Sequence, residues 1–258
     1  AAKGVEAQTK KLFRVCKQRE IPVFTFMNKL DRQAKDPLEL LQELEDALGL
    51  PSVAVTWPIG SGLSFQGVYH RQENRIYFTD GRQMDLDGAD RNALLQELKS
   101  RLDSGCVDFT STDTMAEELA VCDEGLLEQY LETGMVDDSQ IAQLVAERKA
   151  FPCYFGSALK LDGVDALLDG LERYLPAPQY GADFGARVFK IARDAQGNRL
   201  SYLKITGGAL SVREQLSGGE DGGWQEKVSG IRIYSGEKFR TAERVESGMV
   251  CAVTGLTH

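Results

Sequence analysis

The hydrophobic residues in the first 178 positions fall into short continuous runs and longer periodic segments. Residues 21–27 form a run rich in Val, Ile and Phe, and residues 53–57 and 153–155 form two more. A short apolar run bounded by polar residues is typical of a strand that is buried on both faces. The three runs therefore predict a parallel sheet in an α/β domain.

Helices are predicted between and beside these strands. Residues 4–19 carry apolar side chains at helical spacing, and so do residues 164–175. The segment 36–48 opens with Asp36 as a cap and Pro37 at the first helical position, and it stops at a glycine. The alternation of strands and helices favours the α/β fold class.

The β-α rhythm is interrupted between about residues 58 and 150. Residues 65–79 predict a hairpin, and residues 90–102, 123–131 and 139–149 predict helices. We expect this stretch to be an α+β insertion in the first domain.

The pattern becomes all β after Pro176 and Pro178, which stop the last helix and stiffen a linker. Short strands at the spacing seen there predict a small barrel. The strand candidates are residues 184–191, 200–206, 228–234 and 249–254. The predicted organisation is an α/β domain over residues 1–178 and a β-barrel over residues 179–258.

Composition narrows the function only slightly. The chain carries 30 Lys and Arg against 39 Asp and Glu, a net charge of −9, which excludes a general positive coat for nucleic acid. No apolar run reaches the length of about 18 residues that predicts a membrane span. The five cysteines form no C-x-x-C pair, so we expect free thiols in a reducing cytoplasm and no zinc site.

Asn28, Lys29 and Asp31 directly follow the first predicted strand, where an α/β sheet places its ligand. The Asp31 carboxylate is able to accept from both the ring N–H and the exocyclic amine of guanine, at roughly 1.5–3 kcal/mol for each charge-assisted bond. Adenine would turn an acceptor toward that carboxylate and is rejected. The Asn28 amide either holds the other edge of the base or ties neighbouring loops, and the Lys29 stem lies across the ring. A solvated turn after a strand is the alternative interpretation.

Gly156, Ser157 and Ala158 follow the third predicted strand and precede a helix. Small residues there let the backbone come close to a ligand. We expect the Ala158 N–H to donate to the guanine carbonyl and hydrogen bonds from Ser157 to hold Asp31 in place. Each motif by itself is compatible with a plain turn, but the two together predict a guanine site.

At these residues the sequence resembles the translational GTPases related to elongation factor G. Asn28-Lys29-Leu30-Asp31 matches the base-reading motif of that family, and Ser157-Ala158-Leu159 matches its last nucleotide-contact loop. Residues 2–9 are similar to the segment that leads into the helix before the first motif.

Other segments of the sequence resemble two different subfamilies. Residues 57–60 and 65–69 resemble the start of the insertion in peptide chain release factor three. Residues 123–130, 188–191 and 199–203 look more like the tetracycline ribosomal-protection proteins. We take the ribosomal-protection, antibiotic-resistance type as the main interpretation and a termination GTPase of the release factor three type as the alternative.

The resemblance implies a fold and a ligand. The fold is the C-terminal half of a P-loop GTPase-type G domain with its insertion, followed by the β-barrel that forms domain two of translation factors. The ligand is GTP or GDP, with Mg²⁺ in the intact parent. The residues implied to bind guanine are Asn28, Lys29, Asp31, Ser157, Ala158 and Leu159.

The resemblance also implies partners and a location. The ribosome, both RNA and proteins, is contacted through the barrel in the cytoplasm, without a membrane or DNA partner. Basic barrel side chains would serve RNA phosphates. The candidates are Arg232, Lys238, Arg240 and Arg244. Scattered surface charges on the barrel are the alternative interpretation, and the sequence alone favours it.

The chain departs from the family pattern at the phosphate site. No G-x-x-x-x-G-K-[ST] occurs in the 258 residues, so the chain is expected to start midway through the nucleotide domain. We therefore expect the intact parent to be a GTPase, no catalytic residue in this part, and no tight binding of GTP by this part alone.

Two further hypotheses stay open. In the first, the parent has lost catalysis and serves only as a ribosome-binding module. In the second, an unrelated α/β nucleotide-binding domain is fused to a barrel, which predicts that Asn28 and Ser157 lie far apart.

Overall fold

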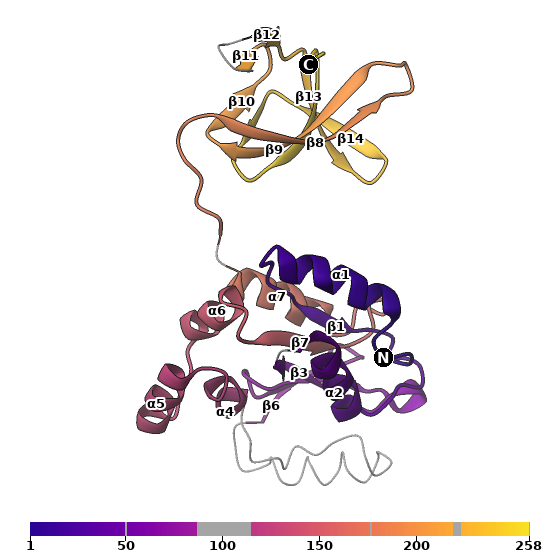
Figure 1. The fold of residues 1–258 in the computed structure, drawn as a ribbon. Coiled ribbons are helices and arrows are strands. Elements are labelled where there is room, and N and C mark those ends of the chain that lie inside the picture. The colour runs from indigo at the N-terminus through magenta and orange to yellow at the C-terminus, as the bar shows by residue number, and fades with distance from the viewer. Residues whose placement is uncertain (50, 87–114, 176, 219–222, 258) are drawn as a thin grey trace. The chain divides into compact units, whose positions relative to one another are not determined.

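The computed structural model describes residues 1–49, 51–86, 115–175, 177–218 and 223–257. The chain divides into two compact units, Ala1–Pro176 and Ala177–His258. Each unit has a core of its own, and each is described by itself (Figure 1).

A three-stranded parallel sheet lies at the centre of the first unit, in the order β1-β7-β2. Its strands are β1 (Thr25–Met27), β7 (Phe151–Phe155) and β2 (Ser52–Ala54). All five residues of β7 are buried, as expected for a central parallel strand. β1 is shorter than the predicted run 21–27. The register would set the preceding residue, Phe24, opposite Pro152, which has no N–H to donate.

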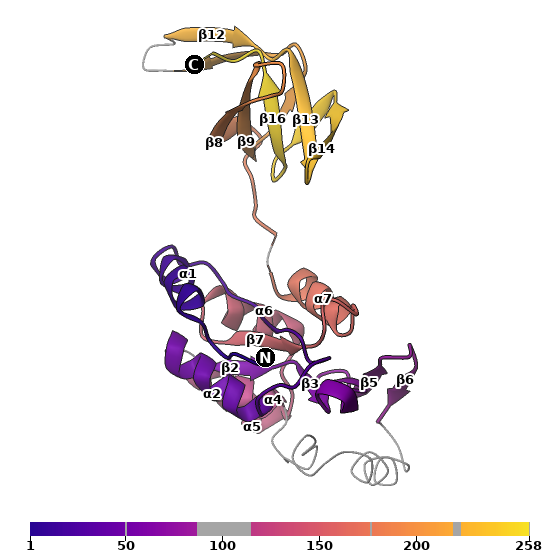
Figure 2. The same cartoon turned by 90° about the vertical axis from the view of Figure 1, so that its right-hand side faces the viewer.

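Helices cover both faces of this sheet (Figures 1 and 2). α1 (Ala7–Gln18) and α2 (Pro37–Leu48) share one core with Phe151, Cys153 and Phe155 of β7. The opposite face, which carries Tyr154, packs against four helices. They are α4 (Met115–Ala120), α5 (Glu124–Thr133), α6 (Asp138–Ala146) and α7 (Val164–Tyr174).

α2 begins and ends where the sequence predicts. The Asp36 side chain accepts hydrogen bonds from the backbone N–H groups of Leu38 at 2.9 Å and Glu39 at 3.3 Å, which satisfies two donors of the first turn. Gly49 adopts a left-handed conformation with φ of 69° and ends the helix.

The segment between β2 and β7 contains a four-stranded antiparallel sheet in the order β3-β4-β5-β6. The strands are β3 (Thr56–Ile59), β4 (Gly67–His70), β5 (Arg75–Phe78) and β6 (Gln83–Asp85), and a 3-10 helix spans Gly62–Ser64. The predicted single strand 53–57 is therefore two strands in two sheets, separated at Val55.

The helices of this segment match the predictions in part. α5 and α6 lie close to the predicted positions, and the Asp137 side chain caps α6 by accepting from Ser139 and Gln140 N–H groups. α4 was not predicted, and the predicted helix 90–102 falls outside the described residues. Glu118 of α4 pairs with Arg71 at 2.7 Å and so anchors this helix to the loop after β4.

The second unit is built from antiparallel strands. A five-stranded sheet has the order β14-β13-β16-β9-β8, and two pairs, β10-β15 and β11-β12, complete the unit. The strands are β8 (Gly185–Arg193), β9 (Arg199–Gly207), β10 (Ala209–Ser211), β11 (Gln215–Gly218), β12 (Trp224–Lys227), β13 (Gly230–Ser235), β14 (Lys238–Ala242), β15 (Arg244–Glu246) and β16 (Val250–Thr254). An α/β unit followed by an antiparallel β unit is the predicted fold class.

Within the described residues, no helix has both the length and the apolar character needed to cross a membrane.

Candidate functional site

The parallel register brings the carboxyl ends of β1 and β7 together. Met27 lies opposite Phe155, and the backbone continues the contact beyond the strands. The Gly156 N–H donates to the Met27 carbonyl at 3.2 Å, and the Leu30 N–H donates to the Gly156 carbonyl at 3.2 Å. The two loops that carry the predicted motifs are therefore neighbours, which contradicts the hypothesis that Asn28 and Ser157 lie far apart.

The Asn28 side chain ties the two loops. Its Oδ1 accepts from the Lys29 N–H at 2.7 Å and from the Ala158 N–H at 2.9 Å. Lys29 has a φ of 71°, a left-handed conformation that is uncommon for a side-chain-bearing residue and that the first of these bonds supports. The Ala158 N–H, which we expected to donate to guanine, donates to Asn28 instead, because the Asn28 amide oxygen reaches it across the two loops.

The Asp31 carboxylate is held from one side. Its Oδ1 accepts from the Ser157 hydroxyl at 2.7 Å, and Ser157 is completely buried. In the described part of the chain, the second carboxylate oxygen of Asp31 accepts no hydrogen bond. The arrangement leaves an oriented acceptor at the end of the sheet, as predicted for Ser157 and Asp31.

The backbone around Ser157 is rigid. Ser157 and Asp162 exchange two backbone hydrogen bonds, at 3.0 and 3.1 Å. A Cβ on Gly156 would lie 2.1 Å from the Asp162 carbonyl oxygen, so only glycine fits there. Burial raises the pKa of the Asp162 carboxyl; the positive charge of Lys160 partly opposes this effect, and the negative charge of Asp31 adds a smaller increase.

Two site residues face solvent. Lys29 is exposed, and the Leu159 side chain is 78% exposed. The aliphatic stem of a lysine and an apolar side chain, both exposed in the two loops, are able to contact the faces of a flat ring.

Sequence reasoning missed Thr56. Its hydroxyl oxygen accepts from the Phe155 N–H at 2.8 Å, and Thr56 is completely buried. The bond satisfies the last N–H of β7 after β2 has ended, so Thr56 positions the start of the Ser157 loop. The only signal in the sequence is a single hydroxyl residue within the apolar run 53–57.

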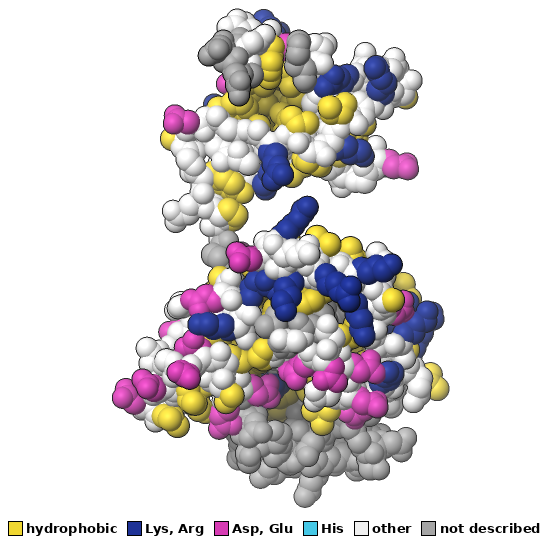
Figure 3. Space-filling model, in the orientation of Figure 1, with side chains coloured by type: hydrophobic (Ala, Val, Ile, Leu, Met, Phe, Trp, Pro, Cys, Tyr) yellow, Lys and Arg dark blue, Asp and Glu magenta, His cyan; other side chains and the backbone are white. Residues whose placement is uncertain are grey.

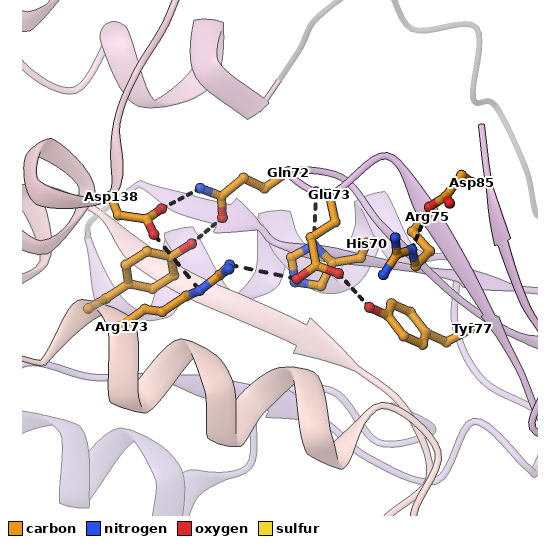
Figure 4. A network of polar contacts seen from close by, with 9 residues as sticks. His70, Gln72, Glu73, Arg75, Tyr77, Asp85, Asp138 and Arg173 are labelled. Atoms are coloured by element: carbon orange, nitrogen blue, oxygen red, sulfur yellow. Dashed lines mark hydrogen bonds and ion pairs between the residues drawn. The ribbon is translucent and has the colours of Figure 1, made fainter. Parts of the chain in front are cut away.

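A second polar cluster lies at the turn of the β4-β5 hairpin (Figure 4). The Gln72 amide donates to Asp138 of α6 at 2.6 Å and accepts from the Tyr174 hydroxyl. Arg173 of α7 lies 3.7 Å from Glu73 and 3.8 Å from Asp138. The cluster joins the hairpin to the two helices that flank the Ser157 loop and β7.

His70 is a buried member of this cluster, as is Tyr174. His70 is 4% exposed, and its Nδ1 accepts from the Glu73 N–H at 3.3 Å. Burial lowers the pKa of His70, and the negative charge of Glu73, whose carboxylate also accepts from Tyr77 at 2.5 Å, partly opposes that effect. Nothing at this cluster points to a ligand, and its role is to hold the hairpin in place.

Comparison with known proteins identifies the family. The family model of the elongation factor Tu GTP-binding domain matches residues 1–177, more than half of the chain. The chain belongs to the translational GTPases of the elongation factor G superfamily.

Two curated relatives that match almost the whole chain are release factors. Peptide chain release factor 3 of Lactobacillus gasseri is 33% identical over 265 residues, which cover 95% of this chain. The same factor of Streptococcus pneumoniae strain 70585 is 34% identical over 277 residues, which cover 98% of this chain. The chain spans 46% and 48% of the lengths of these two relatives.

A solved structure has the same fold. The crystal structure of a Thermus thermophilus protein matches 98% of this chain with a TM-score of 0.74 and 24% identity, and the match covers 37% of that protein. The predicted G-domain-type unit followed by a β unit is confirmed.

Proposed function

We propose that this chain supplies the guanine-recognising part of a GTP- and GDP-binding site in a translation factor that hydrolyses GTP on the ribosome. The residues assigned to the guanine site, by contact with the base or by holding its two loops, are Asn28, Lys29, Asp31, Ser157, Ala158 and Leu159. Asp31 selects guanine, Asn28 and Ser157 hold the two loops together, and Lys29 and Leu159 contact the ring faces.

The observation that carries the proposal is the hydrogen bond from Ser157 to Asp31 at 2.7 Å. It fixes the orientation of the carboxylate, while the second oxygen and a remaining lone pair of the first are still able to accept hydrogen bonds. Guanine presents an N–H and an amine side by side, and a fixed carboxylate accepts both. Adenine has an acceptor in place of that N–H, so its binding would leave the carboxylate unpaired.

In this proposal, Mg²⁺ would be bound by the phosphates of the nucleotide. Among the residues that the structure describes, no group of three or more His, Cys, Asp or Glu is able to hold a metal ion. We assign no metal ligand and no catalytic residue in this chain. The bound nucleotide would contain the bond that is hydrolysed, with Mg²⁺ on its phosphates. The residues of this chain would select guanine over adenine.

The β unit is proposed to contact ribosomal RNA in the cytoplasm. Four aromatic rings form a row across its sheet, with centroids 6.2, 5.6 and 5.3 Å apart, in the order Phe189, Tyr202, Tyr234 and Phe239. Lys190 and Arg232 lie 5.2 and 4.6 Å from the Tyr202 and Phe239 ring centres. Rings interleaved with cations suit RNA bases and phosphates.

Between the two subfamilies, the relatives favour termination. Relatives that are 33% and 34% identical over nearly the whole chain are named peptide chain release factor 3. We therefore propose a release factor three type of activity, with ribosomal protection against tetracycline as the second candidate. GTP hydrolysis by the protein at its natural length, measured with and without ribosomes, tests the activity, and tetracycline rescue of translation in the same extract separates the two candidates.

Binding of a nucleoside tests base recognition without the phosphates. In ¹⁵N-labelled chain, we expect guanosine to shift the backbone amide signals of Lys29 and Ala158, and adenosine to leave them unchanged. Equal shifts with both nucleosides, or shifts confined to other residues, would remove these loops from the base site.

A further inference from the structure

α1 carries a concentrated positive charge in an otherwise acidic chain. Its twelve residues contain Lys10, Lys11, Arg14 and Lys17 and no acidic side chain, whereas the whole chain has a net charge of −9. Figure 3 shows the dark blue side chains gathered over this helix and the acidic ones elsewhere on the unit.

The four side chains lie on the exposed side of the helix. Phe13 is the buried residue of α1 and packs into the core with Phe151, at a ring distance of 6.1 Å. Lys10, Arg14 and Lys17 follow one another at spacings of four and three residues, so they form a single row about 10 Å long. Lys11 lies beside that row, and all four residues are exposed.

The row lacks close acidic partners within the described part of the chain. None of its four residues makes an ion pair within 4.0 Å there. The hydrogen bond from Lys35 lowers the pKa of the neighbouring Glu43, and the charge of Lys10 adds only a smaller effect in the same direction. Like charges three and four residues apart destabilise a helix. Lys10 and Arg14 are also far from the C-terminal end of α1, where a cation would be favoured by the helix dipole.

The helix is nevertheless held firmly in place. The Arg148 guanidinium donates to the Lys17 carbonyl at 3.1 Å and satisfies an acceptor of the last turn. The row is therefore presented on a fixed surface and not on a flexible tail.

We propose that this basic row of α1 (Lys10, Lys11, Arg14 and Lys17) is a docking surface for the phosphate backbone of RNA. The inference rests on the proposed function, because the ribosome then supplies the RNA. Long cationic side chains without partners suit a row of phosphates, which they contact without reading the bases. The acidic surface elsewhere on the unit would orient the molecule with α1 toward the RNA.

The row is distinct from the proposed guanine site and from the aromatic row of the β unit. It shares no residue with either. Loss of the basic row should therefore change RNA affinity and leave base selectivity unchanged.

The test compares two triple variants with the same charge change. The first, Lys10→Gln/Arg14→Gln/Lys17→Gln, removes the row and keeps residues that favour helix. The control, Lys3→Gln/Arg82→Gln/Lys227→Gln, removes three exposed cations elsewhere in the chain. Circular dichroism and the melting temperature check that all three proteins are folded alike.

Binding is measured with a fluorescent RNA duplex of mixed sequence at several salt concentrations. We expect the row variant to bind about tenfold more weakly or worse at low salt, and its plot of log affinity against log salt to be less steep by about three. The control should match the unchanged protein. Equal weakening in both variants, or no weakening in the row variant, overturns the proposal.

Two competing partners are outcomes of the same test. Binding of the row to vesicles of anionic lipid in preference to the duplex would make it a membrane surface, which the exposed Leu12 and Val15 nearby would favour. Association of the protein with itself that the row variant abolishes would make an acidic face of a second copy the partner. Either result overturns the RNA assignment.

The guanosine measurement separates this inference from the proposed function. Failure of the duplex test with intact guanosine shifts removes only the role of α1. Failure of the guanosine shifts and of ribosome-stimulated hydrolysis, with the duplex result intact, removes the proposed function and leaves a basic RNA-binding helix.

Discussion

Asp31 and Ser157 are 126 positions apart in the chain, and their side chains meet at 2.7 Å. At the scale of the residue, this contact decides what the carboxylate is able to do. A buried hydroxyl that donates to one oxygen fixes the rotamer of Asp31 and leaves the second oxygen, and a lone pair of the first, for a ligand. The residue types were readable in the sequence, but the division of labour between the two oxygens was not.

The substitution Asp31→Asn tests base choice directly. An amide in this position presents an N–H₂ group where guanine has its amine and xanthine has a carbonyl, so we expect the preference to move from guanine toward xanthine nucleotides. Each lost charge-assisted bond is worth roughly 1.5–3 kcal/mol, which predicts at least about a tenfold loss of GDP affinity. Competition of GDP and xanthosine diphosphate on the protein at its natural length measures the change.

Asp162→Asn is the matched control for that experiment. Asp162 lies in the neighbouring loop, its backbone bonds to Ser157, and among the described residues its side chain makes no hydrogen bond to Asp31. This variant should keep the preference for guanine. An unchanged preference in Asp31→Asn, or the same switch in both variants, would take Asp31 out of the base site.

At the scale of the element, close contact between α7 and β7 sets the position of the Ser157 loop. Gly170 of α7 faces the Tyr154 ring of the central strand, and a Cβ there would lie 1.8 Å from the tyrosine hydroxyl oxygen. The tyrosine hydroxyl is buried and makes no hydrogen bond among the described residues. Close packing and not a hydrogen bond therefore holds α7 against β7 at this point. Glycine is needed at position 170 because any larger residue would clash with Tyr154.

Gly170→Ala should destabilise the first unit although alanine favours helices. The helix gains about 1 kcal/mol from alanine, whereas overpacking of a filled core costs roughly 1–3 kcal/mol. We expect a net loss of up to about 2 kcal/mol in the free energy of unfolding. Urea unfolding followed by Trp57 fluorescence in a Trp224→Phe background reports on this unit.

Gly125→Ala in α5 is the control for the alanine effect. A Cβ at Gly125 would meet only the Asp123 side chain, at 3.3 Å, so this variant should be unchanged or slightly more stable. Adding Tyr154→Phe to Gly170→Ala should recover part of the loss. Equal stability of the two glycine variants would mean that α7 is free to move away from β7.

At the scale of the whole molecule, the hairpin between β4 and β5 is joined to α6 and α7 by a polar cluster with a buried histidine. Glu73, Arg75, Asp169 and Arg173 are the charged groups that act on His70. Burial disfavours the charged imidazole more than the carboxylates favour it, so the pKa of His70 in the folded protein lies below its ordinary value of 6.5. The cluster therefore makes stability depend on pH.

The sign of that dependence follows from linkage. Above pH 6.5, His70 is neutral in both the folded and the unfolded chain and contributes no pH dependence. As the pH falls below this value, His70 becomes protonated in the unfolded chain but stays neutral in the folded chain. The free energy of unfolding therefore decreases until the pH reaches the pKa of His70 in the folded protein. The slope for one proton is at most about 1.4 kcal/mol per pH unit.

His70→Asn isolates this effect, because asparagine keeps an acceptor for the Glu73 N–H. We expect the free energy of unfolding of the first unit to fall more steeply below about pH 6.5 in the unchanged protein than in the variant. Carboxylates that titrate in the same range contribute equally to both curves. Parallel curves would show that His70 is charged, or accessible to protons, in the folded protein.

Much of the fold was predictable from short stretches of sequence. The cap at Asp36, the left-handed Gly49 and the buried run at β7 depend on neighbours in the sequence, and they appear as predicted. Long-range constraints explain the differences. The run 53–57 divides between two sheets because Thr56 bonds to Phe155, a contact that no local pattern contains.

The sequence by itself determined which residues are available for chemistry: a carboxylate after one buried strand, small residues after another, and their likeness to a GTPase family. These are properties of residue type and spacing, and they can be recognised without knowledge of the folded structure. Only the tertiary structure decided which atoms meet, because hydrogen bonds such as those of Asn28 with Ala158 and of Ser157 with Asp31 span more than a hundred residues. Their geometry is set by the register of β1 on β7, which arises only when both faces of the sheet are packed.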